Sequence, residues 1–256
     1  MNALIKRYYT SFTDDFDETR NQNIKLDKDY KFIRSDILSK FYSALIYAAA
    51  VILSYPYCRF FLHIKFIGRK KIKDFKSTGF FLYANHTQPI GDVFTPAHAA
   101  FPKRIYTVVS EANYGIPVIG KILPYLGALP ILDSVNGIKE LSKSIETRIN
   151  EKKCIVIYPE AHVWDYCTFI RPFSDTSFKF PAKLSVPVFS MTAVYKKSKI
   201  LKKPKALYYI DGPFFSDGKS VKDRAGDLKN QVFEKMTERS KESNSDYIEY
   251  IKKEEI

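Results

Sequence analysis

Apolar runs from about Phe60 onward alternate with helical patterns, and this order predicts an α/β fold. The runs are rich in aromatic or β-branched residues and are bounded by glycine, proline or polar turn residues, as strands are. They read FFLHIKFIG, GFFLYAN, RIYTVVS, GALPIL, KCIVIYP, VPVFSMTAVY and ALYYIDGPF. Several are apolar at consecutive positions, which favours strands buried on both faces. We therefore expect a mixed, largely parallel sheet flanked by helices.

Two segments have apolar residues at spacings of three and four, which is typical of amphipathic helices. Their apolar positions are Ile138, Leu141, Ile145 and Ile149 in the first segment, and Val221, Ala225, Leu228, Val232 and Met236 in the second. We expect both helices to cover a face of the sheet.

An uncharged apolar segment, Phe41 to Cys58, precedes the strands. Its length is close to the lower limit of about 18 residues for crossing a bilayer. Its tyrosines, serines and Pro56 favour an interfacial position over a span, and a buried helix is the remaining alternative. The polar residues before it do not resemble a cleaved signal peptide. We divide the chain into a polar arm with a hydrophobic membrane-associating helix, residues 1–62, and an α/β domain, residues 63–256.

The charge of the chain favours an anionic partner. Lys and Arg number 41 against 28 Asp and Glu, a net charge of +13. Basic clusters span residues 69–76 and 196–205, and near an anionic membrane each such charge contributes roughly 1 kcal/mol. The apolar segment beside them favours a membrane surface. We expect no nucleic-acid partner, because no interleaved aromatic motif or known reader fold is present.

Several common chemistries lack their motifs. The cysteines form no C-x-x-C pair, so we expect them to be reduced and the protein to be cytosolic. The segment GIPVIGK resembles a phosphate-binding loop, but Ile122 follows where Ser or Thr would hold magnesium. There is no G-x-S-x-G and no H-E-x-x-H motif. The histidines are scattered, so we expect no metal and no resident cofactor.

His86 is the first candidate for chemistry, because it emerges directly after the apolar run GFFLYA. Pro89 and Gly91 predict a turn that brings Asp92 back towards it. A carboxylate that accepts from one imidazole nitrogen makes the other nitrogen a better general base. A histidine satisfied within the core would show the same local pattern.

Glu160 is the second candidate, in the segment IVIYPEAHVW, where another apolar run ends. Burying a carboxylate is costly unless it meets a partner or ligand, so Glu160 is a candidate for a binding site. Capping the next helix is the alternative role. His162 follows two residues later.

Four blocks occur in an order that resembles the lysophospholipid acyltransferase family, which includes bacterial 1-acyl-glycerol-3-phosphate acyltransferases. NHTQPIGD is similar to the family's N-H-x-x-x-x-D block, LGALPILD to G-x-x-P-I-x-R, YPEAHVW to F-P-E-G-T-R, and VPVFSMTAV to V-P-I-x-P-V. The resemblance implies that His86 is the general base, Asp92 its orienting partner and acyl-CoA or acyl carrier protein the donor. It also places Asn85, Glu160 and His162 at the substrate site.

The chain departs from the family pattern in two ways. Five residues separate His86 from Asp92, where the family has four. Asp133 and Val163 stand where the family has arginines that hold the acceptor's phosphate. Either other cations replace these arginines, or the acceptor is not the usual one. The candidate replacements, which could also form an ordinary basic face, are Arg171, the first choice, then Lys179 and Lys183.

Together these observations predict an enzyme that transfers a fatty acyl group to the hydroxyl of a lysophosphatidate-like acceptor. The resemblance implies bacterial phospholipid biosynthesis at the cytoplasmic face of the cell membrane. Two alternatives are a non-catalytic lipid- or membrane-binding relative and an acyltransferase with a different hydroxyl acceptor.

Overall fold

A seven-stranded sheet forms the centre of the computed structural model, which describes residues 4–16, 24–27, 29–88, 90–198 and 203–253. The strand order is β2-β8-β7-β3-β6-β4-β5, and all neighbours are parallel except β7 and β8. The strands are β2 (Lys65–Ile67), β3 (Phe80–Ala84), β4 (Ile105–Ser110), β5 (Ala128–Ile131), β6 (Cys154–Ile157), β7 (Val188–Lys196) and β8 (Lys205–Phe214). The predicted mixed, largely parallel sheet is confirmed.

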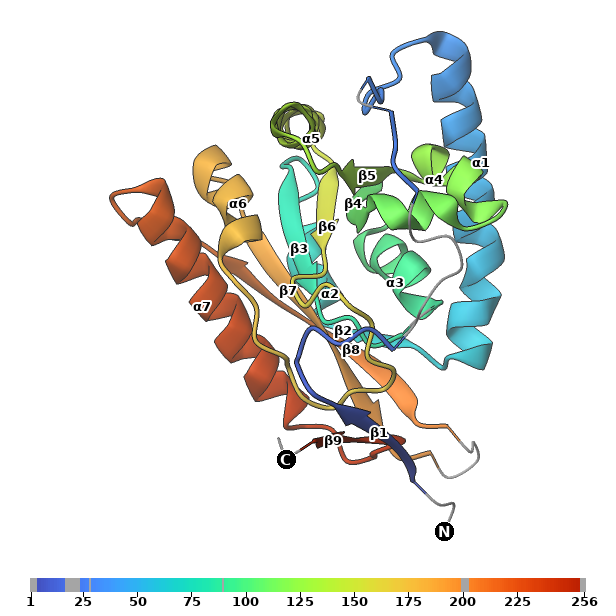
Figure 1. Ribbon diagram of the computed structural model, residues 1–256, viewed down its shortest axis with the longest axis vertical. Helices are drawn as coiled ribbons and strands as arrows, with labels where there is room; N and C mark the ends of the chain where they lie inside the picture. Colours follow the sequence, from blue (N-terminus) through green and yellow to red (C-terminus); the bar gives the residue numbers. More distant parts are fainter. Residues whose placement is uncertain (1–3, 17–23, 28, 89, 199–202, 254–256) are drawn as a thin grey trace.

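Helices cover both faces of the sheet (Figure 1). Phe80, Leu82 and Ala84 of β3 pack towards one face, and Phe81 and Tyr83 pack towards the other. The first face is covered by α1 (Ile37–Pro56), α2 (Arg69–Lys73) and α3 (Gly91–Ala100), and the second by α5 (Val135–Asn150), α6 (Lys179–Leu184) and α7 (Val221–Ser240). The short helix α4 (Ile119–Leu126) packs against α1.

The two amphipathic helices predicted from spacing are α5 and α7. Their buried positions include most of the predicted apolar faces. The first residue of each set differs, because Ile138 is 56% exposed and Val221 is 38% exposed. Both lie in the first turn of their helices.

The first half of FFLHIKFIG was wrongly predicted as a strand. Tyr57–Phe61 form a π-helical turn that continues α1, and only Lys65–Ile67 of this run enter the sheet. Pro56 has no N–H to donate, but it is the last residue of α1. The chain therefore continues past it as a π-helical turn.

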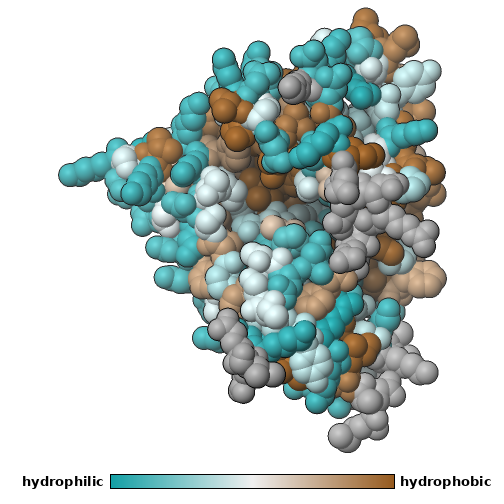
Figure 2. Space-filling view, in the orientation of Figure 1, coloured by the Kyte–Doolittle hydropathy of each residue, from teal (hydrophilic) through white to brown (hydrophobic). Residues whose placement is uncertain are grey.

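The apolar helix α1 is exposed to solvent along most of its length. Ile37–Phe61 is long and apolar enough to cross a membrane, but only 6% of its most apolar window is buried. The alternative of a buried helix is therefore wrong. Figure 2 shows the hydrophobic residues of this region along the right edge of the molecule. Exposed apolar side chains on this helix and its extension include Ile37, Leu38, Phe41, Leu45, Ile52, Leu53, Phe60 and Phe61.

The two ends of the chain form a small sheet of their own, which the sequence did not predict. Strand β1 (Ile5–Tyr9) pairs in parallel with β9 (Ile248–Lys252). Tyr9 packs with Trp164 and Cys167, which lie in the loop after β6. The beginning of the predicted polar arm is thus built into the same body as residues 63–256.

Of the basic cluster 196–205, residues 199–202 lie outside the described residues.

Candidate active site

His86 and Asp92 form a hydrogen-bonded pair at the carboxyl end of β3. The two atoms His86 Nδ1 and Asp92 Oδ2 are 2.8 Å apart. Asp92 stands in the first turn of α3, where its backbone N–H donates to the carbonyl of Gln88 at 2.8 Å. This turn accommodates the extra residue between the two side chains. Pro89, predicted to help make the turn, lies outside the described residues, and Gly91 begins α3.

Asp92 also holds the loop that carries His86. Its Oδ2 accepts from the backbone N–H groups of Thr87 and Gln88, both at 2.9 Å, and its side chain is 1% exposed. Because a carboxylate can only accept, a neutral imidazole here carries its proton on Nδ1 and a lone pair on Nε2. The His86 side chain is 20% exposed. A neutral imidazole in this state can take a proton from a hydroxyl group.

Two tyrosines that the sequence analysis did not select support this loop. The ring of Tyr158 stacks on the ring of His86 with centroids 4.3 Å apart, and its hydroxyl donates to the Asp92 carbonyl at 2.6 Å. The Tyr195 hydroxyl lies 2.8 Å from the hydroxyl of Thr87. Their sequence signal is weak, because each is only an aromatic residue near the end of an apolar run.

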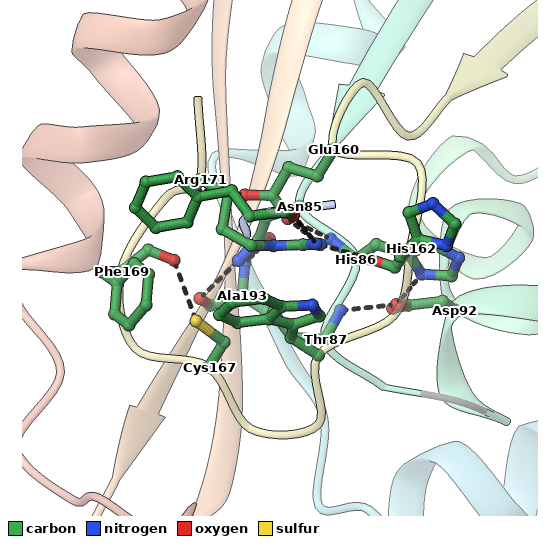
Figure 3. Close-up of polar contacts among 12 residues, drawn as sticks. Asn85, His86, Thr87, Asp92, Glu160, His162, Cys167, Phe169, Arg171 and Ala193 are labelled. Carbon is green, nitrogen blue, oxygen red and sulfur yellow. Dashed lines mark hydrogen bonds and ion pairs between the residues drawn. The ribbon is translucent and has the colours of Figure 1, made fainter. Parts of the chain in front are cut away.

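Glu160 fastens the loop after β6 to the loop after β3 (Figure 3). Its carboxylate accepts from the backbone N–H of His86 at 3.1 Å and from that of Arg171 at 2.9 Å. Trp164 N–H in turn donates to the carbonyl of His86 at 3.0 Å. Burial raises the pKa of the Glu160 carboxyl, and the Arg171 guanidinium opposes this shift. Glu160 was expected to contact substrate, but its carboxylate is satisfied within the protein.

Arg171 is likewise engaged internally, contrary to its predicted role in holding an acceptor phosphate. Its side chain is 1% exposed, and Nη2 lies 3.1 Å from the carboxylate of Glu160. The guanidinium also donates to the carbonyls of Phe12 and His162, and it lies over the ring of Trp164. All of these partners belong to the protein itself, so the Arg171 side chain supports the loop after β6 from within.

The remaining predicted site residues lie in different surroundings. Both amide atoms of Asn85 bond to the backbone of Ala193, so this side chain fastens β3 to β7. His162 is partly exposed, and its Nδ1 lies 3.4 Å from the carboxylate of Asp15. Lys179 is exposed at the start of α6, which covers the sheet face opposite α3. Lys183 belongs to the same helix and is also exposed.

Asp133, which the sequence analysis singled out, forms an ion pair with a residue of the N-terminal region. Asp133 is paired with Lys25 at 2.8 Å, and Lys25 also contacts Glu111 at 2.9 Å. This cluster lines a shallow pocket of about 420 Å³ beside β4 and β5. Two carboxylates against one ammonium make it a poor place for a phosphate group.

Among the described residues, no three His, Cys, Asp or Glu side chains are grouped so that they could hold a metal ion. The expectation that the reaction needs no metal and no cofactor stays a prediction.

The fold and this site define an α/β protein with a histidine–carboxylate pair at the end of a central parallel strand. No known family model matches the chain, and no curated protein matches it. Among solved structures it is similar to the crystal structure of the 1-acyl-sn-glycerophosphate (LPA) acyltransferase PlsC from Thermotoga maritima. The TM-score is 0.55 at 17% identity, over 82% of this chain and 97% of that chain. At this identity the similarity shows a shared fold.

Proposed function

We propose that the protein is a membrane-associated O-acyltransferase that uses His86 as its general base. The observation that carries the proposal is the 2.8 Å contact of Nδ1 with buried Asp92, which leaves Nε2 as a proton acceptor. The fold shared with a lysophosphatidate acyltransferase supports it.

In the proposed reaction, Nε2 of His86 removes the proton from an acceptor hydroxyl as the oxygen attacks the carbonyl carbon of an acyl thioester. A C–O bond forms and the C–S bond breaks. The proton held by the imidazolium then passes to the departing thiolate, so the products are an ester and a free thiol. Asp92 stabilises the imidazolium while it exists. General-base assistance of this kind contributes about 10² to 10⁴ in rate.

The proposed donor is acyl-CoA or acyl carrier protein, and the proposed acceptor is a lysophosphatidate-like lipid or another lipid with a free hydroxyl. Neither Arg171, which is buried, nor Lys179, which lies on the opposite sheet face, supports a phosphate near His86. A different hydroxyl acceptor is therefore part of the proposal. The exposed apolar helix α1 and the net charge of +13 support contact with an anionic membrane surface. The proposed place of the reaction is the cytoplasmic face of a bacterial membrane, in phospholipid synthesis.

The alternative of a non-catalytic relative rested partly on the longer spacing between His86 and Asp92. The 2.8 Å contact removes that reason, because the pair is within hydrogen-bond reach. Only the substituted arginine positions still favour this alternative.

The test is thiol release by the purified full-length protein, with acyl-CoA or acyl carrier protein and a panel of lipid acceptors, followed by lipid chromatography. We expect acceptor-dependent release that His86→Ala abolishes. His63→Asn is the matched control, because His63 has a positive φ of 49° that asparagine tolerates and lies outside the pair. Release that is independent of every acceptor, or unchanged by His86→Ala, would contradict the proposal.

A further inference from the structure

A second pocket lies on the sheet face covered by α1 and α3, away from His86. It has a volume of about 760 Å³, within the range of roughly 300–1,000 Å³ that is usual for small-molecule sites. Its apolar walls come from α1, its π-helical extension, β2 and the segment that ends α3. They include Val51, Cys58, Ile64, Phe66 and Phe101.

Three cations stand around these apolar walls. Arg59, Lys65 and Arg69 line the pocket, and no acidic residue does. Within the described part of the chain, none of the three forms an ion pair. An uncompensated group of three positive charges at an apolar pocket favours an anionic ligand with an apolar body.

The guanidinium of Arg69 is fixed in place by hydrogen bonds to the end of α3. Its Nε donates to the carbonyl of Ala99 at 3.0 Å and its Nη2 to the carbonyl of Phe101 at 3.1 Å. These bonds fix the plane of the guanidinium and leave Nη1 without a partner among the described residues. Capping the end of α3 is a structural role that explains Arg69. It does not explain why Arg59 and Lys65 also line the pocket.

The inner wall of the pocket carries no charge at neutral pH. His98 is buried there, and its Nε2 lies 2.9 Å from the hydroxyl of Ser54. Burial lowers the pKa of His98, with a smaller contribution from Arg69. The positive charge is therefore concentrated on the three longer side chains, where a headgroup would sit, and the interior suits a hydrocarbon chain.

The mouth of the pocket adjoins the exposed apolar surface of α1 and its extension. Ile52 and Tyr55 line the pocket and are 69% and 56% exposed, and neighbouring Phe60 is 65% exposed. Figure 1 shows α1 and α3 side by side at this edge of the molecule. A lipid in a membrane that contacts α1 could enter without crossing water.

We propose that this pocket binds a single-chain lipid with a phosphate headgroup, at a site separate from the His86–Asp92 pair. The apolar walls take the chain, and three cations match the two charges of a phosphate monoester better than the single charge of a carboxylate. None of the residues around His86 lines the pocket. His98 follows Asp92 by six residues on α3, which corresponds to about 9 Å along the helix axis. The proposal concerns binding and does not require acyl transfer.

The test uses monododecyl phosphate, which has the proposed headgroup and no hydroxyl that could be acylated. Native mass spectrometry of the full-length protein released from detergent would count bound molecules, with dodecanoate and monododecanoylglycerol as comparison ligands. We expect one bound monododecyl phosphate, at an affinity about tenfold or more above either comparison ligand. The same binding should remain in His86→Ala, so loss of acyl transfer and loss of this site can be told apart.

Variants locate the site. Arg59→Gln combined with Lys65→Gln should weaken phosphate binding about tenfold or more and leave monododecanoylglycerol unaffected. Lys70→Gln combined with Lys73→Gln, which removes the same charge from exposed positions on α2, is the matched control. Val51→Trp, which fills the pocket, should remove both ligands. The proposal is overturned if the control pair weakens binding equally, if dodecanoate binds as tightly, or if the Arg59 and Lys65 changes have no effect.

Discussion

Replacing Asp92 by asparagine removes one negative charge from the proposed catalytic pair and puts an amide NH2 group where Oδ1 has no hydrogen-bond partner among the described residues. The new amide keeps an oxygen that can accept from the N–H groups of Thr87 and Gln88, which now donate at 2.9 Å. We therefore expect a cost of about 2–4 kcal/mol in the free energy of unfolding, from weaker hydrogen bonds and an unpaired buried amide N–H. The effect on the reaction is separate and is measured on the folded protein.

The magnitude follows from the geometry of the pair. During the reaction His86 becomes an imidazolium, held 2.8 Å from the Asp92 oxygen. Charges about 4 Å apart, centre to centre, attract by about 4 kcal/mol at an effective dielectric constant of about 20. Each 1.4 kcal/mol changes a rate about tenfold, so losing most of this attraction lowers kcat by about 10² to 10³.

The assay is acceptor-dependent thiol release at saturating donor. We expect kcat to fall while KM for the donor changes by less than about threefold, because Asp92 is buried and acts through His86. Asp133→Asn is the matched control, since this carboxylate side chain is 80% exposed. An Asp92→Asn protein that kept more than a third of the wild-type kcat would refute the role of the pair.

Three further predictions concern other parts of the molecule. Glu160→Gln should lower the free energy of unfolding by about 3–5 kcal/mol, because it leaves the buried Arg171 without its counter-charge; urea titration measures this, and a loss below about 1 kcal/mol would show that the pair is not structurally important. The free energy of unfolding should also fall as the pH drops below about 6.5, the usual pKa of histidine. The folded protein holds the pKa of His98 below that of the unfolded chain, so the unfolded chain binds the proton first. Urea titrations across this range should show a weaker pH dependence in His98→Gln. Leu53→Glu combined with Phe60→Glu should reduce co-sedimentation of the protein with anionic liposomes about tenfold or more. The melting temperature should not change, because both side chains are exposed. Unchanged liposome binding would exclude this face of α1 as the membrane contact.

The sheet and the two long amphipathic helices were predictable because their signals are local. A strand buried on both faces must be apolar at consecutive positions, as Phe80–Ala84 is, and a helix that covers it must repeat every three to four residues. The pairing of His86 with Asp92 was also accessible, since only a short turn separates them.

The small terminal sheet was not predictable in the same way. The residues of β1, Ile5–Tyr9, are mostly exposed, and their partners Ile248–Lys252 lie at the other end of the chain. Neither segment carries the alternating or continuous apolar pattern of a buried strand. The contact of Tyr9 in β1 with Trp164 depends on the fold of the whole chain, because the two residues are far apart in the sequence.

The sequence by itself determined the class of fold, an apolar segment of nearly membrane-spanning length, and His86 with Asp92 as a candidate pair, because these depend on residue types at short spacings. The exposure of that helix and the contact within the pair came from the structure. Only the tertiary structure decided what the buried charges do. A buried Glu160 or Arg171 must have a partner, since leaving a charge unpaired in the interior is costly. Which partner it has depends on contacts between distant segments, and here the two charges meet each other and the backbone of His86 and Phe12.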